Sequence, residues 1–255
     1  MKILTYNLWD SPAGMPTRNT HIQNTLSAMQ ADVLCLQEIA EKAAADILAD
    51  ICDCPYRQYD LRSATAVLSK YPIRSVQHHD SASAVILDFE DLSFRIVNAH
   101  LPWNSAVLRE KAILEIVRMA ETEETDYTIL AGDFNCSAGS DVHRWLTGEC
   151  TLQGTDACYF DLAESWQMQS GQFPENTLDF RSNPRWGAYE PANTIEKPQR
   201  YDRIYLKNPY PAVLPVLKSF GIFGTEVYRE TGLAASDHYG IYAELLFIHQ
   251  KGSQV

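Results

Sequence analysis

Several features that define membrane-bound, secreted or multidomain proteins are missing from this sequence. No apolar run is long enough to span a bilayer, and the start, MKILTYN, has neither the basic region nor the cleavage site of a secretory leader. No stretch rich in Gly and Ser, or in Pro, divides the 255 residues into two parts. We therefore expect a cytoplasmic protein without a membrane partner, built as a single domain over residues 1–248 with a flexible tail over 249–255. The sequence does not specify an oligomeric state, and a monomer is the default expectation.

Cysteine is sparse, and several local motifs are absent. The six cysteines have neither the paired spacing of a zinc site nor the density of a disulfide scaffold, so we expect reduced thiols. No G-x-S-x-G, P-loop or G-x-G-x-x-G motif occurs, which argues against ordinary serine hydrolases, NTPases and dinucleotide-binding enzymes. No H-E-x-x-H motif occurs either, and the adjacent pair His78 and His79 falls in a predicted turn, so a zinc hydrolase is not supported.

Basic residues are scarce relative to acidic ones. The chain has 21 Lys and Arg against 33 Asp and Glu, a formal net charge of −12. This charge disfavours non-specific electrostatic binding to nucleic acid or to an anionic membrane, so a nucleic-acid partner must be bound through a local site. Local basic character is available where Arg181, Arg185, Lys197, Arg200 and Arg203 gather in one predicted loop and strand.

The residues that are present alternate between strand and helix patterns. Apolar runs predict buried strands over 2–8, 31–37 and 127–130, and shorter runs predict four successive strands over 64–69, 73–77, 83–89 and 93–99. Helical spacing of apolar residues predicts helices over 17–29, 41–51, 105–120, 141–145 and 161–168. Residues 169–198 form a predicted long loop, 207–232 a predicted irregular segment, and 200–206 and 239–248 the closing strands.

Polar residues suited to catalysis lie repeatedly at or beside the ends of these strands. They are Asn7, Glu38, His100, Asp133, Asn135, Asp202, Asp237 and His238. In layered α/β proteins the strand ends open onto one rim, where side chains distant in the sequence converge on a ligand. Each residue alone has an ordinary structural interpretation, because Asp and Asn serve in turns and caps and a histidine can be satisfied in the core. Their repeated occurrence at strand ends favours a functional site.

Seven segments occur in the order typical of one known superfamily. They are TYNLW (5–9), LCLQEI (34–39), AVLSKYPI (66–73), NAHLPWN (98–104), LAGDFN (130–135), RYDRIYL (200–206) and ASDHYGIYAEL (235–245). By this ordered set the chain resembles the endonuclease/exonuclease/phosphatase superfamily. The resemblance implies a DNase I-like α/β fold, a four-layered α/β/β/α sandwich of two mixed β-sheets with helices outside. It also implies a phosphoesterase site on one rim that uses Mg²⁺, with Mn²⁺ able to substitute.

The resemblance assigns the metal to three residues. Glu38 is the first choice as the Mg²⁺ ligand, since Mg²⁺ takes one or two carboxylates plus waters. Asn7 would support the metal or a phosphate oxygen without adding negative charge. Asp237 would complete the outer shell of the metal through water.

Five further residues are expected to carry out the hydrolysis. Asp133 is the favoured base for the attacking water, and Asn135 would orient that water or the phosphate. His238, held by Asp202 as a carboxylate–imidazole pair, and His100 would donate to the developing charge on phosphate. Whether Asp133 or His238 is the base stays open.

The substrate is the least determined feature. Residues 199–245 are most similar to the branch that hydrolyses 5′-tyrosyl–DNA phosphodiesters, so a DNA end is the expected partner and DNA repair the expected role. In NTLDFRSNP (176–184), Leu178 stands where that branch has a tryptophan, and Trp186, Tyr189 or Trp103 could supply the stacking surface instead. We expect substrate contacts from Arg203, Trp103 and Asn104. Two alternatives remain: an enzyme for a small or lipid phosphate ester, and a non-catalytic binding protein on the same fold.

Overall fold

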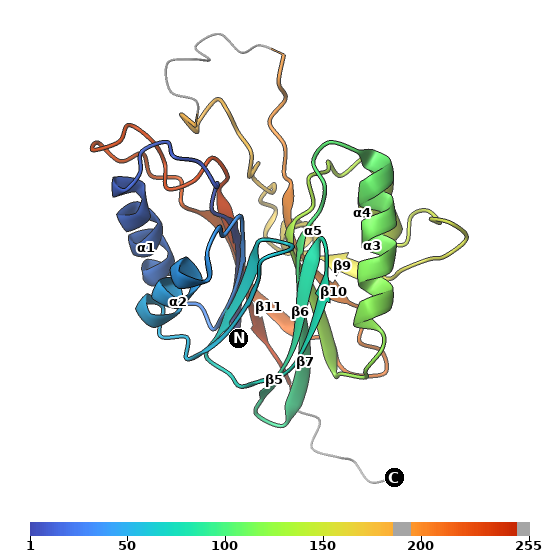
Figure 1. Cartoon of the computed structure of the whole chain (residues 1–255). Coiled ribbons are helices and arrows are strands. Elements are labelled where there is room, and N and C mark those ends of the chain that lie inside the picture. Colours follow the sequence, from blue (N-terminus) through green and yellow to red (C-terminus); the bar gives the residue numbers. More distant parts are fainter. Residues whose placement is uncertain (186–194, 249–255) are drawn as a thin grey trace.

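Two six-stranded β-sheets pack face to face, and helices cover their outer faces (Figure 1). The computed structural model describes residues 1–185 and 195–248. The strand order is β11-β12-β1-β2-β4-β3 in the first sheet and β5-β6-β7-β8-β10-β9 in the second. Each sheet contains both parallel and antiparallel pairs. The predicted α/β/β/α sandwich of two mixed sheets is therefore confirmed.

The elements follow the predicted order closely. The first sheet consists of β1 (Lys2–Asn7), β2 (Val33–Gln37), β3 (Tyr56–Asp60), β4 (Thr65–Ser69), β11 (Val216–Phe223) and β12 (Gly240–Leu246). The second sheet consists of β5 (Ile73–His79), β6 (Ala82–Phe89), β7 (Leu92–His100), β8 (Tyr127–Asp133), β9 (Tyr159–Asp161) and β10 (Asp202–Lys207). The helices are α1 (Thr17–Met29), α2 (Lys42–Ile51), α3 (Ala106–Ala120), α4 (Asp141–Leu146) and α5 (Leu162–Ser170).

Three strands depart from the sequence prediction. β3 is a largely exposed edge strand and β9 has three residues, so neither shows a clear apolar period. The prediction of an irregular segment is wrong for β11, an edge strand whose register shifts between Leu217 and Ser219. That shift breaks the alternation by which strands are recognised. His78 and His79 end β5 and do not form the predicted turn.

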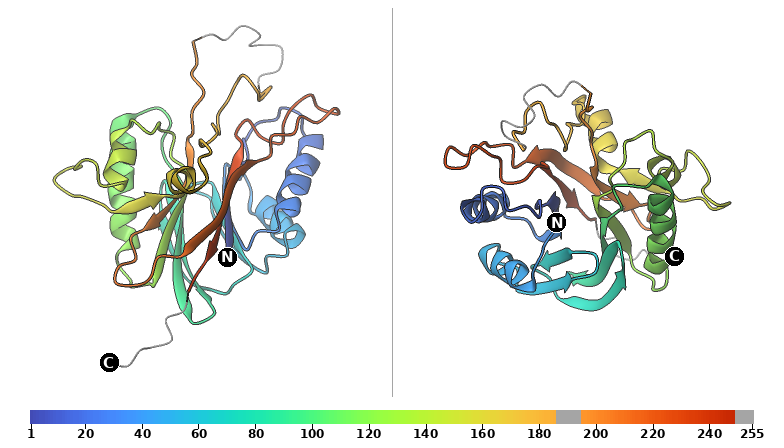
Figure 2. Two further views of the ribbon diagram at one scale, coloured as in Figure 1. Left: turned by 180° about the vertical axis from the view of Figure 1, so that it is seen from behind. Right: turned by 45° about the horizontal axis from the view of Figure 1, so that its top comes forward.

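Apolar faces attach the helices to the sheets. Ile22 of α1 and Leu48 of α2 pack with Leu34 on the outer face of the first sheet. α3 and α4 cover the second sheet in the same way. α5 packs against β10 and β11, as seen from behind in Figure 2. Asp161 begins α5 by accepting a 2.9 Å hydrogen bond from the Ala163 backbone N–H.

The period of two along each strand decides which side chains reach the space between the sheets. On β8, Ile129 and Ala131 belong to the core between the sheets, whereas Leu130 packs with the outer helices. The same alternation directs Asp133, the last residue of β8, inward. Alternate side chains of each strand therefore reach the rim of the space between the sheets.

A buried polar contact joins the sheets just beneath this rim. Gln37 Nε2 donates to Asn98 Oδ1 at 2.6 Å and to Thr5 Oγ1 at 2.9 Å. Asn98 Nδ2 donates in turn to the carbonyl of Leu36 at 2.9 Å. Because Asn98 lies on β7 and the other three residues on β1 and β2, these bonds fix the first sheet relative to the second.

Some predictions concern parts that the structure does not describe. The tail predicted over 249–255 lies outside the described residues, as do Trp186 and Tyr189. All six cysteines are free, as expected for reduced thiols. Within residues 1–185 and 195–248, each helix is too short or too polar to cross a membrane.

Candidate active site

Strand ends from both sheets meet at the upper rim in Figure 1. β1 and β2 are parallel, so Asn7 lies beside Gln37, and β7 and β8 are parallel, so His100 lies beside Asp133. β10 runs antiparallel to β8 and begins at this rim, where Asp202 lies opposite Asp133. Parallel strands end at one edge of a sheet, which explains why residues distant in sequence converge here.

Asn7 connects two acidic residues that come from different sheets. Its Nδ2 donates to Glu38 Oε1 at 2.9 Å and to Asp133 Oδ2 at 3.1 Å. Its Oδ1 accepts from the backbone N–H of Trp9 at 2.9 Å, which fixes the orientation of the amide. A neutral donor between two carboxylates stabilises both without adding charge.

Glu38 follows β2 directly and has a left-handed backbone conformation, with φ of 56°. Non-glycine residues rarely adopt this conformation, and such residues cluster at functional sites. Its two carboxylate oxygens face different groups. Oε1 accepts from Asn7, and Oε2 accepts from the backbone N–H of Asp10 at 2.8 Å.

Asp133 is almost fully buried and is held by Asn135. Its Oδ1 accepts from the Asn135 backbone N–H at 2.8 Å, and its Oδ2 accepts from Asn135 Nδ2 at 3.2 Å. Asn135 has φ of 48°, and its Nδ2 also donates to the carbonyl of Leu101 at 3.0 Å. The turn therefore presents a carboxylate whose position is fixed.

Asp202 and His238 form the predicted carboxylate–imidazole pair. His238 Nδ1 lies 2.8 Å from Asp202 Oδ2, and both residues are buried. The other ring nitrogen, Nε2, lies 4.0 Å from Asp133 Oδ2. Burial opposes the charged imidazolium, but Asp202 and Asp133 outweigh it and raise the pKa of His238 to about 10.

His100 and Asp237 complete the group of converging residues. His100 Nε2 lies 3.9 Å from Glu38 Oε1 and 3.8 Å from Asp133 Oδ2, so the ring faces both carboxylates. Burial raises the pKa of Asp237 to about 6, and repulsion from Glu38 and Asp133 adds to this shift. Before Asp237, Ser236 Oγ donates to the carbonyl of Asn7 at 2.6 Å and ties this loop to β1.

The donor set fits a divalent cation. Ligand-type atoms of Asp133, Asp202 and His238 lie within 4.8 Å of one another. Burial is the main cause that raises the pKa of Asp237, and the nearby Glu38 and Asp133 carboxylates add to it, so a bound cation would stabilise the charged forms of these groups. The site could hold a metal through these residues or through Glu38, the ligand that the sequence resemblance assigns.

Thr177 supports the site, although the sequence pattern does not predict this. It is fully buried, and its Oγ1 accepts from the backbone N–H groups of Tyr201 and Asp202, both at 3.1 Å. Its carbonyl accepts from the N–H of Tyr239 at 2.7 Å. Thr177 thus joins the start of β10 to the residue after His238. In the sequence, Thr177 is marked only by its position beside Leu178 in the segment NTLDFRSNP (176–184).

Arg18 is a second supporting residue that the sequence pattern does not predict. The guanidinium is fully buried, and its five hydrogen bonds all go to backbone carbonyls. The acceptors are Leu8 at 3.0 Å, Trp9 at 2.8 Å, Ser11 at 2.7 Å, Ala13 at 2.8 Å and Ala235 at 3.0 Å. One side chain therefore connects the loop after Asn7 with the loop that carries Asp237.

The predicted substrate contact of Arg203 is wrong. Its side chain is fully buried, and Nη1 lies 2.9 Å from Asp161 Oδ2. Because neighbouring residues of a strand point to opposite faces, the inward position of Asp202 turns Arg203 toward the outer side of the sheet. Arg185, another of the basic residues noted in the sequence, is close enough to Asp237 for its charge to lower the pKa of that carboxyl. Arg185 also pairs with Glu196.

Trp103 and Asn104 are exposed on the loop that follows β7. Arg109 Nη1 holds this loop by donating to the carbonyls of Pro102 and Trp103, both at 3.0 Å. Both side chains are therefore accessible beside His100, and their contact with substrate stays a prediction.

Solved structures share this fold across almost the whole chain. TDP2 of D. rerio, complexed with single strand DNA product, is 19% identical with a TM-score of 0.71 and covers 95% of this chain and 97% of its own. Truncated TDP2 of Caenorhabditis elegans is 18% identical with a TM-score of 0.71, and the match covers 96% of this chain and 97% of that one. Beta toxin of Staphylococcus aureus is 16% identical with a TM-score of 0.66, and the match covers 96% of this chain and 99% of that one. At these identities the likeness establishes the fold alone.

Sequence comparison decides the family. Among curated proteins there is no significant match. The profile of the Endonuclease/Exonuclease/phosphatase family, however, matches residues 4–238, a range that includes every residue placed at the rim. The chain belongs to the Endonuclease/Exonuclease/phosphatase family.

Proposed function

We propose that this protein is a Mg²⁺-dependent phosphodiester hydrolase that acts on nucleic-acid ends. The observation that carries the proposal is the convergence of Asn7, Glu38 and Asp133 with the His238–Asp202 pair at one rim. This set combines carboxylates for a hard cation, a base for water and donors for a phosphate oxygen. A Mg²⁺ held at Glu38 would supply Lewis-acid stabilisation of the charge on the phosphate.

Side chains of the protein provide the base, the positioning groups and the donor to the phosphate. Asp133 accepts the proton of the attacking water, while Asn135 and Asn7 hold its carboxylate in position. The raised pKa of His238 favours the protonated ring in the metal-free protein, which supports a role as donor to the phosphate. Asp202 orients that ring through Nδ1. His100 faces the same carboxylates from β7.

Two considerations support a nucleic-acid end as the substrate. Residues 199–245 are most similar to the 5′-tyrosyl–DNA phosphodiesterase branch, and the D. rerio TDP2 structure contains a single strand DNA product. The net charge of −12 disfavours non-specific binding along a duplex, so the proposal is restricted to ends. The same acidity favours a second candidate, a small or lipid phosphate ester, for which phosphate-backbone contacts are unnecessary.

Hydrolysis of bis-p-nitrophenyl phosphate with and without Mg²⁺ tests the enzyme proposal. We expect turnover that requires the metal and is lost in Glu38→Ala. If metal-loaded, folded protein hydrolyses neither this compound nor nucleic acids, the non-catalytic alternative holds. A panel of 5′-phosphotyrosyl oligonucleotide, abasic duplex, sphingomyelin and inositol phosphates then separates the substrate classes, and preference for either of the last two would reject the nucleic-acid assignment.

A further inference from the structure

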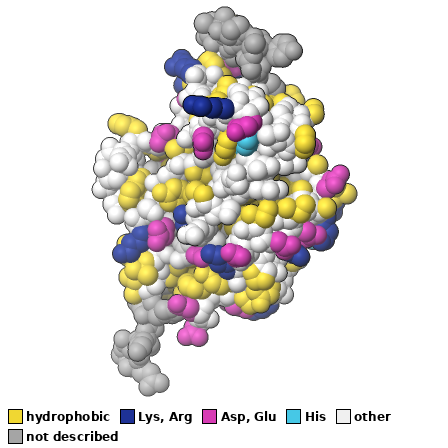
Figure 3. Space-filling view, turned by 90° about the vertical axis from the view of Figure 1, so that its left-hand side faces the viewer, with side chains coloured by type: hydrophobic (Ala, Val, Ile, Leu, Met, Phe, Trp, Pro, Cys, Tyr) yellow, Lys and Arg dark blue, Asp and Glu magenta, His cyan; other side chains and the backbone are white. Residues whose placement is uncertain are grey.

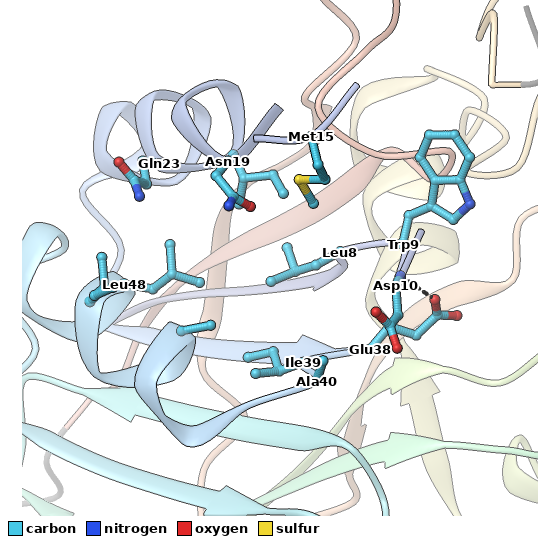
Figure 4. A pocket seen from close by; sticks show the side chains of 13 residues that line it. Leu8, Trp9, Asp10, Met15, Asn19, Gln23, Glu38, Ile39, Ala40 and Leu48 are labelled. Atoms are coloured by element: carbon cyan, nitrogen blue, oxygen red, sulfur yellow. Dashed lines mark hydrogen bonds between the residues drawn. The ribbon is translucent and has the colours of Figure 1, made fainter. Parts of the chain in front are cut away.

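A groove lies between α1 and α2, beside the candidate active site (Figure 4). Its lining is largely apolar, and its volume is about 160 Å³. Leu8, Ile22, Ile39 and Leu48 are buried in it. Figure 3 shows the face that carries these two helices, where hydrophobic side chains gather in patches between charged ones.

The mouth of the groove exposes apolar side chains to solvent. Met15 is 38% exposed and Ile47 is 51% exposed, although both line the groove. Exposed apolar surface of this kind, when it lines a concavity, is typical of a ligand-binding site.

Glu38 is shared between the groove and the candidate active site. Oε1 receives the bond from Asn7 and lies 3.9 Å from His100 Nε2, whereas Oε2 receives the Asp10 N–H. Asp10 and Glu38 both line the groove, and Figure 4 shows them together at one end of it. A phosphate bound through a metal ion at Glu38 would therefore have this groove as its immediate neighbour on the α1 and α2 side.

The lining specifies the chemistry of the occupant. Within the described residues, no Lys or Arg lines the groove, and the polar members away from Glu38 are the neutral Asn19 and Gln23. A phosphate or a nucleotide backbone would meet two carboxylates there and no cation. The volume is close to that of an apolar cavity that binds benzene in another protein. An uncharged ring or short alkyl group matches both the lining and the size.

We propose that this groove is a specificity subsite that binds the apolar substituent of the phosphate ester whose phosphate lies at Glu38. The inference rests on the proposed function, and it restricts the substrate class to esters with an aryl or alkyl group attached through the phosphate. Both substrate candidates include such esters, since a tyrosyl adduct supplies an aryl group and a lipid supplies an alkyl group.

Calorimetric binding of three phosphonates in saturating Mg²⁺ tests the subsite. Methylphosphonate, butylphosphonate and phenylphosphonate share one anionic head and differ only in the apolar group. We expect phenyl- or butylphosphonate to bind the wild-type protein at least about tenfold more tightly than methylphosphonate, as burial of the extra carbons predicts. A tighter phenylphosphonate indicates an aryl ester, and an equal or tighter butylphosphonate indicates an alkyl ester.

Paired substitutions locate the effect in the groove. In Met15→Gln and Ile47→Gln, phenyl- and butylphosphonate should bind no more than about threefold more tightly than methylphosphonate. Each substitution places a polar amide at the apolar mouth of the groove. Met168→Gln is the matched control, since Met168 is 85% exposed on α5 and does not line the groove. It should keep the wild-type ratio.

Equal affinities for the three phosphonates, or binding of none, would overturn the subsite. So would a wild-type ratio in both groove variants. Calorimetry needs no turnover, so a failure of the subsite is separable from a failure of the hydrolase proposal, which depends on bis-p-nitrophenyl phosphate.

Discussion

Arg18 on α1 donates a 3.0 Å hydrogen bond to the carbonyl of Ala235, 217 positions later in the chain. Ala235 directly precedes Ser236 and Asp237, while the other carbonyls bound by Arg18 belong to the loop that follows Asn7. The two loops that flank the candidate metal site are therefore held by one guanidinium. Since a guanidinium has five N–H donors, all of them are used here.

Arg18→Lys should lower the Mg²⁺ affinity of the folded protein as well as its stability. An ammonium group has three donors and cannot reproduce the planar five-bond arrangement. We expect a lower melting temperature, and weaker Mg²⁺ binding measured by calorimetry well below that temperature. Arg62→Lys is the control, because the Arg62 side chain is largely exposed and its Nε lies 3.8 Å from Asp60 Oδ1. Unchanged Mg²⁺ affinity in the folded Arg18→Lys protein would limit Arg18 to a structural role.

Asp202→Asn should lower both the pKa of His238 and the turnover. The Asp202 carboxylate is the largest of the causes that raise this pKa to about 10, so its neutralisation favours loss of the ring proton at a lower pH. Titration of the His238 ring by NMR in the metal-free protein should show the shift. We expect kcat to fall by about a hundredfold or more.

A second carboxylate–imidazole pair serves as the control for this change. Asp60 Oδ2 lies 2.8 Å from His78 Nδ1 on strands outside the candidate site. Asp60→Asn should leave kcat and the His238 titration at their wild-type values. Equal losses in the two variants would mean that kcat reports general stability and not the Asp202–His238 pair.

The sequence predicts the rim because strand ends carry a recognisable signal. Asp133 and Asn135 follow an apolar run, and parallel pairing brings such ends together. The same period of two would have indicated the orientation of Arg203, because an inward Asp202 requires its neighbour to point outward.

Other parts of the site have no local signal in the sequence. Thr177 and Arg18 act through backbone N–H and carbonyl groups, which every residue has, so the sequence does not specify their partners. The groove beside Glu38 arises from the separation of two helices, each of which would be predicted correctly alone. Such features depend on tertiary contacts between distant segments.

Asp161→Asn should destabilise the protein strongly. Burial alone would raise the pKa of Asp161, but Arg200 and Arg203 outweigh it and hold the pKa below its ordinary value of 3.8. Removal of the charge leaves Arg203 buried without its carboxylate partner, at a cost of about 3–5 kcal/mol. Urea unfolding at neutral pH measures the loss. Glu121→Gln breaks a half-exposed pair with Lys207 and should cost less than about 1 kcal/mol.

The same pair predicts a pH dependence. A carboxyl whose pKa is depressed in the folded state stabilises the protein above its unfolded pKa, and this contribution is lost as the pH falls through the folded value. The wild-type protein should therefore lose stability below about pH 3.8 more steeply than Asp161→Asn. Parallel curves for the two proteins over this acidic range would contradict the assignment.

Gly132→Ala should displace Asp133. Gly132 has φ of 143°, and a Cβ there would lie 1.9 Å from the carbonyl oxygen of Ala99. β7 and β8 would have to separate, at a cost of about 3 kcal/mol or more, directly beside Asp133. Gly154→Ala is the matched control, since Gly154 also has a positive φ, and no atom of the described residues lies within 4 Å of the added Cβ. It should cost about 1–2 kcal/mol and preserve kcat. Wild-type stability in Gly132→Ala would show that the strands can adjust.

Glu38 and Asp133 should differ in what they contribute, although Asn7 Nδ2 donates to both. Asp133 is buried, is held by Asn135 and is the proposed base for the attacking water. Asp133→Asn should therefore lower kcat by about a hundredfold or more while changing Mg²⁺ affinity little. Glu38→Gln should reduce both quantities, because a neutral amide is a poorer Mg²⁺ ligand than a carboxylate. Calorimetric Mg²⁺ titration combined with bis-p-nitrophenyl phosphate kinetics separates the two effects. If Asp133→Asn weakens Mg²⁺ binding as much as Glu38→Gln does, the metal lies within the group formed by Asp133, Asp202 and His238, and a residue other than Asp133 must be the base.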